Sequence, residues 1–125
     1  MKNFLVTSTI ICTLLINGCK KDESDKSELL GKWLLTEQLA DPGDGSGKYQ
    51  KVTGENKTVT FNQSGEVTGE VFTAPAQYKV LDSVRVEITT KTNNQSIVYR
   101  YKATSKELIL NAPCIEPCGL KFKRQ

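Results

Sequence analysis

The stretch "VRVEITTKTNNQSIVYRYKA", residues 84–103, decides the fold class. In its first half aliphatic residues alternate with charged or polar ones, and the same two-residue period returns from Ile97 to Ala103. Successive side chains of a β-strand point to opposite faces, so this period predicts two strands with one apolar face each. Asn93-Asn94, between them, tolerates the left-handed backbone that a tight turn needs. The stretch therefore predicts an antiparallel hairpin.

Similar runs, rich in β-forming residues and separated by turn residues, flank this hairpin on both sides. Together with its two strands they make eight predicted strands: 30–39, 57–62, 66–72, 76–81, 84–90, 96–103, 107–111 and 119–124. Short links between them require antiparallel neighbours, and closure removes the two exposed edges of an open meander. The sequence from residue 28 to 125 therefore predicts one all-β domain, a small eight-stranded antiparallel up-and-down β-barrel.

Alternation along these runs also predicts which side chains face the interior of the barrel. The inward set is Val59, Phe61, Tyr78, Val80, Val84, Val86, Ile88, Ile97, Tyr99, Tyr101, Leu120 and Phe122. The tyrosines Tyr78, Tyr99 and Tyr101 have two interpretations: they line a ligand cavity, or they fill the core. An eight-stranded barrel has an interior just wide enough for side chains or one small ligand, and core filling is the favoured interpretation for any single tyrosine.

Glu37 is a candidate ligand-binding residue because strict alternation places it on the same face as Trp33, Leu35 and Leu39. Inside the open end of the barrel its carboxylate would hold the cation or hydroxyl of a ligand. A β-bulge before it would instead turn the side chain towards water, and this is the interpretation that we favour.

The first 27 residues differ in composition from the rest. Lys2 precedes an uncharged run from Phe4 to Ile16, which is short for a bilayer span of about 20 residues and has the proportions of a secretory signal. Residues 1–18 are therefore predicted to be a signal peptide and 19–27 a flexible tether, since residues 20–27 contain nothing apolar. An ordinary signal peptide, or a buried helix with Cys19 incidental, is the alternative.

The sequence Ile16-Asn17-Gly18-Cys19 resembles the lipobox of bacterial lipoproteins. In that family the chain is cut before the cysteine, whose thiol carries diacylglycerol and whose amine is usually acylated, palmitate being the expected chain. The resemblance implies that Cys19 is a lipid anchor, since two or three acyl chains hold a protein stably on a membrane. Residues 21–23 resemble the lysine-plus-acidic export signal of surface lipoproteins in one large phylum of Gram-negative bacteria, although any soluble tether looks alike. The expected location is the outer membrane, with exposure at the cell surface.

A second resemblance concerns the barrel. Gly31-Lys32-Trp33 resembles the Gly-x-Trp signature of lipocalins, and the ending "CIEPCGLKFKR" is similar to that of small lipocalin-like lipoproteins. In lipocalins the tryptophan plugs the closed end of the barrel, and an arginine of the last strand packs over its indole ring. The resemblance implies these barrel-closing roles for Trp33 and Arg124. The chain is shorter than a typical lipocalin, so the depth of a ligand cavity stays open.

Charge and cysteine content exclude several classes of function. From Glu28 onward 13 Lys and Arg face 11 Asp and Glu, a net of +2, which is too weak for nucleic-acid binding. In an exported protein the pair Cys114 and Cys118 predicts a disulfide. A zinc site would need two further ligands, and the sequence has no histidine. No metal and no cofactor are therefore expected.

Without histidine the usual general base at neutral pH is missing, so the protein is not expected to be an enzyme. Asp41, Asp44 and Ser46 lack the regular spacing of a calcium loop, and residues 41–47 are predicted to be flexible. The expected function is a membrane-anchored, lipocalin-like lipoprotein that binds a small, largely apolar ligand in the open end of the barrel. The alternative is a filled barrel that serves as a protein-interaction or inhibitor module at the cell envelope, through residues 40–51 or the cysteine hairpin.

Overall fold

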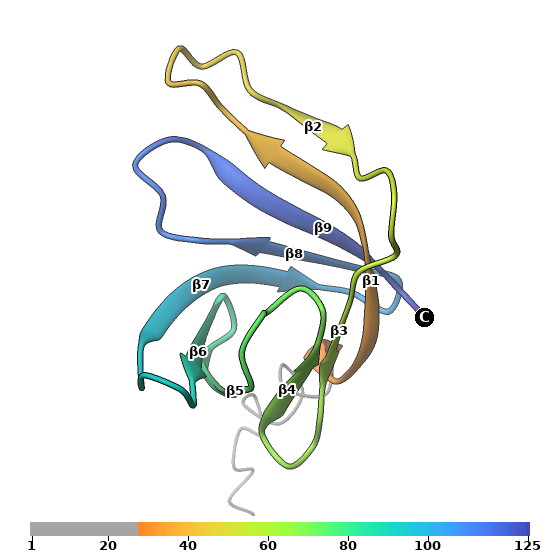
Figure 1. Cartoon of the computed structure of the whole chain (residues 1–125), viewed down its shortest axis with the longest axis vertical. Coiled ribbons are helices and arrows are strands. Elements are labelled where there is room, and N and C mark those ends of the chain that lie inside the picture. Colours follow the sequence, from red (N-terminus) through yellow and green to blue (C-terminus); the bar gives the residue numbers. More distant parts are fainter. Residues whose placement is uncertain (1–27) are drawn as a thin grey trace, which may run out of the picture.

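The computed structural model describes residues 28–125, which form one antiparallel sheet that closes on itself (Figure 1). Its strands are β1 (Gly31–Ala40), β2 (Lys48–Lys51), β3 (Thr58–Phe61), β4 (Glu66–Gly69), β5 (Ala76–Asp82), β6 (Arg85–Thr90), β7 (Ser96–Ala103), β8 (Glu107–Asn111) and β9 (Cys118–Arg124). Pairing of β1 with β9 closes the barrel. The predicted all-β fold, an eight-stranded antiparallel barrel, is confirmed, with β2 as an additional strand.

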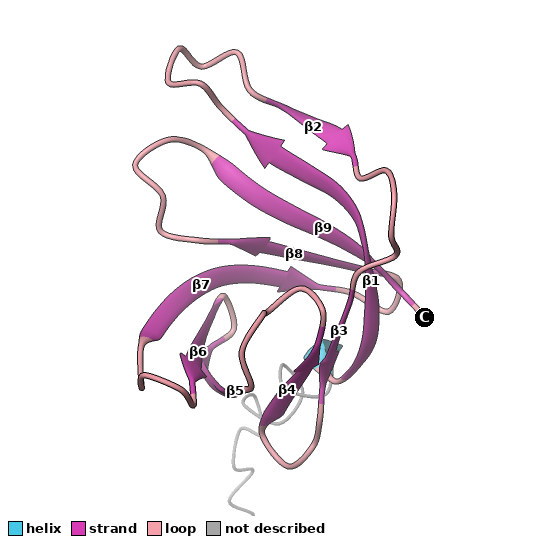
Figure 2. Ribbon diagram, viewed as in Figure 1, coloured by secondary structure: helices cyan, strands magenta, loops and turns pink. Residues whose placement is uncertain are grey.

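Strands account for nearly all the regular structure of this part of the chain, and Glu28 and Leu29 are the helical residues at its start (Figure 2). The predicted signal peptide, the tether and Cys19 lie outside the described residues.

The additional strand β2 continues β3 along the same edge of β1. The first half of β1 pairs with β3 and the second half with β2. Between them the N–H of Val52 donates to the carbonyl oxygen of Thr36, and the N–H of Leu35 donates to that of Lys57, both at 2.9 Å. The prediction that 40–51 is all loop is therefore wrong at residues 48–51. This polar segment lacks the alternation of apolar and polar residues that predicts a strand. It forms a strand through backbone pairing with β1.

Two predicted strand boundaries are also wrong. The predicted strand 66–72 ends at Gly69, whose φ of +115° turns the chain away from the sheet. The strand predicted from Val84 starts one residue later, and Val84 lies in the turn between β5 and β6 with 46% of its surface exposed. In both places turn geometry overrides the local β-forming pattern.

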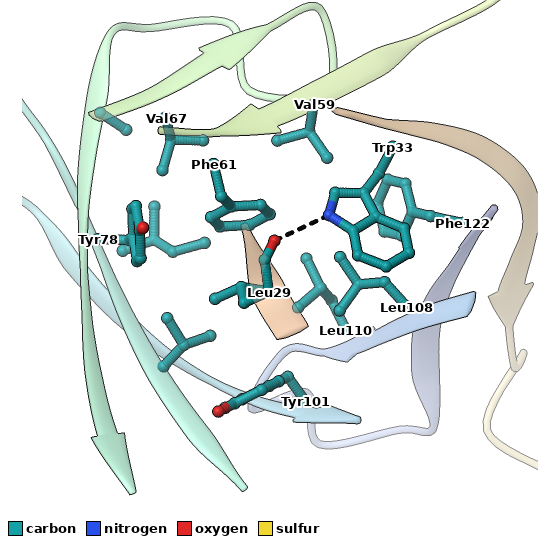
Figure 3. Close-up of a cluster of buried hydrophobic side chains, with 13 residues drawn as sticks. Leu29, Trp33, Val59, Phe61, Val67, Tyr78, Tyr101, Leu108, Leu110 and Phe122 are labelled. Atoms are coloured by element: carbon teal, nitrogen blue, oxygen red, sulfur yellow. Dashed lines mark hydrogen bonds between the residues drawn. The ribbon is translucent and has the colours of Figure 1, made fainter. Parts of the chain in front are cut away.

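The core fills the interior of the barrel (Figure 3). It consists of Leu29, Trp33, Val59, Phe61, Val67, Ala76, Tyr78, Val86, Ile88, Tyr101, Leu108, Leu110 and Phe122. Seven of the residues predicted to point inward are in this set, while Val80, Tyr99 and Leu120 are half-buried and pack against it. Alternation thus placed the inward faces correctly, with Val84 as the exception.

Strand directions separate two ends of the barrel. At the closed end lie residues 28–30, the turns at 62–65, 83–84 and 104–106, and the C-terminus. At the opposite end, here called the mouth, lie the longer loops at 41–47, 70–75, 91–95 and 112–117, while 52–57 runs beside the middle of β1. In Figure 1 β1, β8 and β9 converge near the C-terminus and spread apart towards the mouth.

Candidate functional site

The closed end is sealed by the side chains of Trp33 and Arg124. The guanidinium of Arg124 lies 4.0 Å from the centre of the indole ring, a cation–π arrangement. Its Nη1 donates to the carbonyl oxygen of Leu30 and its Nη2 to that of Glu28, each at 2.7 Å, and its Nε donates to Ser105 at 2.9 Å. With its donors used on backbone carbonyls, this arginine ties the last strand to the residues that precede β1.

Two of the candidate tyrosines belong to the core. The hydroxyl of Tyr78 donates to the carbonyl oxygen of Asn62 at 2.8 Å, and its ring meets Phe61 edge to face at 5.1 Å between centroids. The hydroxyl of Tyr101 donates to the carbonyl oxygen of Asp82 at 3.3 Å. Both side chains are buried. A buried phenol that donates to a backbone carbonyl has its hydrogen-bonding requirement met within the barrel, so its hydroxyl is not available to a ligand.

Tyr99 is different. Its ring is half-buried on the inner face of β7 and meets Phe72 edge to face at 6.1 Å. Burial raises the pKa of its phenol further above neutral pH. Within residues 28–125 that hydroxyl makes no hydrogen bond. Tyr99 therefore presents an unused donor beside an apolar surface.

Several half-buried apolar side chains pack against the core, and the ring of Phe72 meets that of Tyr99. We call five of them the mouth cluster: Leu35, Val71, Phe72, Tyr99 and Leu120. These side chains come from β1, from the loop between β4 and β5, from β7 and from β9. Apolar groups that pack on a core yet stay partly accessible are what a shallow binding cup requires.

The loop that carries Phe72, residues 70–75, is positioned by the conformation of Gly69 and by the side chain of Glu70. Gly69 supplies the turn, and the carboxylate of Glu70 accepts hydrogen bonds from the N–H and the hydroxyl of Thr58, both at 2.9 Å. Under the loop lies a hollow of about 280 Å³ whose apolar lining includes Val67, Phe72 and Pro75. The predicted strand 66–72 includes Phe72, and the only local signal of the loop is Gly69.

Changing Glu70 to glutamine is expected to alter the acid stability of the barrel. The hydrogen bonds from the backbone N–H and the hydroxyl of Thr58 hold the pKa of Glu70 below the usual value of a glutamate. A depressed carboxyl pKa contributes stability that is present above the unfolded pKa and lost as pH falls through the folded one. Urea midpoints measured below pH 4.5 should therefore fall less steeply for E70Q than for the wild type. The control is Glu55→Gln, and a parallel fall in E70Q would contradict the expectation.

Glu37 lies on the outer face of the barrel. The register of β1 against β9 shifts between Leu35 and Glu37, and this bulge places Glu37 opposite Lys121. The Glu37 carboxylate and the Lys121 ammonium are 3.4 Å apart, and the ammonium also lies 4.0 Å from the centre of the Tyr49 ring. Of the two interpretations of Glu37, the structure has the one with the bulge, and the residue is not part of the mouth cluster.

The loop at 41–47 is ordered, which corrects the prediction that it is flexible. The carboxylate of Asp41 accepts hydrogen bonds from the N–H groups of Gly43, Gly45 and Gly47 at 2.7, 3.1 and 2.9 Å. These bonds, that of Gly43 first, lower the pKa of Asp41. A single aspartate thus folds the glycine-rich segment around itself. Among residues 28–125 no three His, Cys, Asp or Glu side chains lie together as metal ligands.

The predicted disulfide between Cys114 and Cys118 is confirmed, and it closes a ring at the tip of the β8–β9 loop. Closing so short a loop contributes about 2 kcal/mol by chain entropy. Ile115 stands fully exposed inside this ring. The ring therefore holds an aliphatic side chain out into solvent at the mouth end of the molecule.

In the part of the chain that the structure describes, no helix is long and apolar enough to cross a membrane.

No protein-family model matches this chain, and no curated protein is similar to it in sequence. Among solved structures it is similar to the glycoside hydrolase family 43 YxiA protein from Bacillus licheniformis, at 17% identity and a TM-score of 0.45. The similarity covers 79% of this chain and 21% of the other, so this chain spans about a fifth of that protein. At that level the similarity carries no argument about function.

Proposed function

We propose that this protein is a lipid-anchored, lipocalin-like lipoprotein of a Gram-negative outer membrane, and that its mouth cluster binds a small, largely apolar ligand. The anchor is Cys19, by the lipobox resemblance of residues 16–19. The cup is shallow, because core side chains fill the interior of the barrel. Chemistry on the ligand forms no part of the proposal.

The observation that supports ligand binding most directly is the difference between Tyr99 and the other two inward tyrosines. The hydroxyls of Tyr78 and Tyr101 donate hydrogen bonds to backbone carbonyls, whereas the hydroxyl of Tyr99 makes no hydrogen bond within residues 28–125. Its neighbour Phe72 and the other members of the mouth cluster are apolar and partly accessible. An apolar surface with one convergent polar group is the usual composition of a small-molecule site.

A ligand that suits this surface has an apolar body and one hydrogen-bond acceptor. Its body would cover the side chains of the mouth cluster, with a gain of about 25 cal/mol for each Å² of apolar surface removed from water. Its acceptor would accept a hydrogen bond from the Tyr99 hydroxyl, which is neutral at physiological pH. The neutral phenol would fix the orientation of the ligand, and apolar burial would supply most of the affinity.

The second candidate function, a protein-interaction or inhibitor module, is favoured by a different observation. Ile115 is fully exposed within a disulfide ring, and a rigid loop that presents an aliphatic side chain loses little entropy when a partner binds it. On this proposal the mouth cluster is merely the top of a filled barrel, and the partner contacts the β8–β9 loop.

Native mass spectrometry of the full chain, purified from cells in a mild detergent, tests the two proposals. Ligand binding predicts a stoichiometric adduct of low mass that solvent extraction removes and that can then be identified. If the protein stays bare after soaking with a mixed lipid extract, ligand binding fails. The same preparation reports the anchor separately, because acylation of Cys19 changes the mass of the protein itself.

Replacing Tyr99 with phenylalanine is expected to weaken the adduct about tenfold, because a hydrogen bond of about 1.4 kcal/mol between ligand and hydroxyl is lost. The matched control is Tyr78→Phe, which removes a hydroxyl bonded to the Asn62 carbonyl at the closed end and should leave ligand affinity unchanged. Titration of both variants with the extracted ligand gives the two dissociation constants. Equal affinities would remove Tyr99 from the site.

A further inference from the structure

The outer wall of the barrel has an apolar patch that the proposed ligand site does not use. Leu81, Val84 and Val98 are 39%, 46% and 38% exposed, and they are three of the four large hydrophobic side chains that are exposed among residues 28–125. All three lie on the β5–β7 part of the wall. The hydrogen bond of 2.8 Å from the Tyr101 N–H to the Val84 carbonyl holds the β5–β6 turn against β7.

Basic side chains surround these aliphatic ones. Arg85 of β6 and Arg100 of β7 are directly opposite each other, and Lys102 follows on the same outer face of β7. Like charges at directly opposed positions destabilise a sheet unless an anion compensates them. Arg85 is paired with Asp82 at 2.7 Å, but neither Arg100 nor Lys102 forms an ion pair within the described residues.

We call this surface the wall patch; it comprises Lys79, Leu81, Asp82, Val84, Arg85, Glu87, Val98, Arg100 and Lys102. Its four basic and two acidic side chains give it a net charge of +2, and Glu28 and Glu107 border it beside Lys102. Two copies placed face to face would repel each other, whereas a surface of negative charge would attract the patch.

The wall patch adjoins the point where the chain leads back towards Cys19. Glu28, Val84 and Lys102 line one hollow of about 290 Å³ at the closed end. Glu28 is itself held there by the 2.7 Å hydrogen bond between its carbonyl oxygen and Arg124. Cys19 precedes Glu28 by nine residues, a length that spans at most about 30 Å. An anchored barrel therefore stays close enough to the bilayer for a weak contact surface to be occupied.

We propose that the wall patch lies against the bilayer that carries the Cys19 anchor, with its basic side chains on anionic lipid headgroups and its aliphatic side chains at the interface. This inference rests on the proposed lipid anchor. In this orientation the β5–β7 wall is next to the membrane and the mouth opens to the side, so the mouth is reached from the aqueous phase.

Photocrosslinking of the lipidated full chain in vesicles tests this orientation. Benzoylphenylalanine is placed at position 98, in the wall patch, or at position 60 on β3, on the opposite wall of the barrel. In vesicles of phosphatidylcholine with phosphatidylglycerol, position 98 is expected to label lipid about fivefold more than position 60. That factor corresponds to the contribution of one basic residue at an anionic surface.

A charge variant separates specific contact from mere proximity. Arg100→Gln with Lys102→Gln should reduce labelling from position 98 to the level of position 60. The matched control, Lys48→Gln with Lys51→Gln on β2 at the mouth end, makes the same change in charge and should leave the labelling unchanged. In vesicles of phosphatidylcholine alone, labelling from position 98 of the unsubstituted protein should likewise fall to the level of position 60.

Equal labelling from the two walls, or labelling from position 98 that ignores the Arg100 and Lys102 changes, would overturn the orientation. Crosslinking to a second copy of the chain would assign the patch to self-association instead. Flotation of the vesicles reports the anchor independently: a protein that does not float lacks it, and then both the anchor and the orientation fail.

Discussion

Replacing Trp33 with alanine is expected to destabilise the barrel by about 3–5 kcal/mol, the range measured for large aromatic side chains removed from cores. Trp33 has no exposed surface, and it packs with Phe122 and with Leu108 at the closed end of the core (Figure 3). Its loss would also remove the surface on which the Arg124 guanidinium stacks. The free energy of unfolding of native proteins is about 5–15 kcal/mol, so this substitution would remove a large part of it.

Urea unfolding followed by far-UV circular dichroism measures this effect, because Trp33 is the only tryptophan of the chain and its fluorescence disappears in the variant. Trp33→Phe serves as the graded control. It keeps an aromatic ring under Arg124 but loses the 2.9 Å hydrogen bond from the indole to the Leu29 carbonyl, at a cost of about 1–2 kcal/mol. A decrease in the free energy of unfolding of less than 1 kcal/mol in W33A would mean that Trp33 is not tightly packed in the core.

Replacing Gly69 with alanine is the second change with a large expected effect, about 3 kcal/mol. A φ of +115° is a conformation that residues with a Cβ rarely adopt, which by itself costs about 1–3 kcal/mol. In addition, a Cβ at this position would overlap the backbone carbonyl of Thr58 on the neighbouring strand. Relief of that overlap requires β3 and β4 to separate, and the loop that carries Phe72 would move with them.

Gly54→Ala is a matched control for the Gly69 change. Gly54 has a φ of +102°, but a Cβ there would meet no atom within 4 Å. Its replacement should cost about 1 kcal/mol, from backbone strain alone. Urea midpoints of the two variants therefore separate strain from overlap. If G54A and G69A were destabilised equally, the contact with Thr58 would have no energetic consequence.

Much of the barrel could be predicted because alternation is a local property. Phe61 and Phe122 follow the two-residue period of their strands, and the structure buries both. Alternation fails where a turn or bulge adds a residue. Thr36 is the extra residue that moves Glu37 to the outer face, and Val84 belongs to a turn although it keeps the period of β6.

The candidate site was harder to predict than the fold. Tyr78, Tyr99 and Tyr101 are equivalent in a pattern of alternating residues, yet only Tyr99 keeps an unused hydroxyl within residues 28–125. The difference depends on which backbone carbonyl comes within reach of each phenol, and those carbonyls belong to segments distant in sequence. The sequence predicts Phe72 to be in a strand, because a single glycine, Gly69, is the only local indication of the turn that ends the strand.

The fold class, the inward faces of the strands and the Cys114–Cys118 pair follow from spacing between near neighbours in the chain, so they can be read from the sequence. The pairing of β2, the direction of the Glu37 side chain and the extent of the core inside the barrel emerge only in the folded structure. These features depend on registers and contacts between strands that are far apart in sequence. Their free energies are set by pairing and packing across the barrel, which no local pattern records.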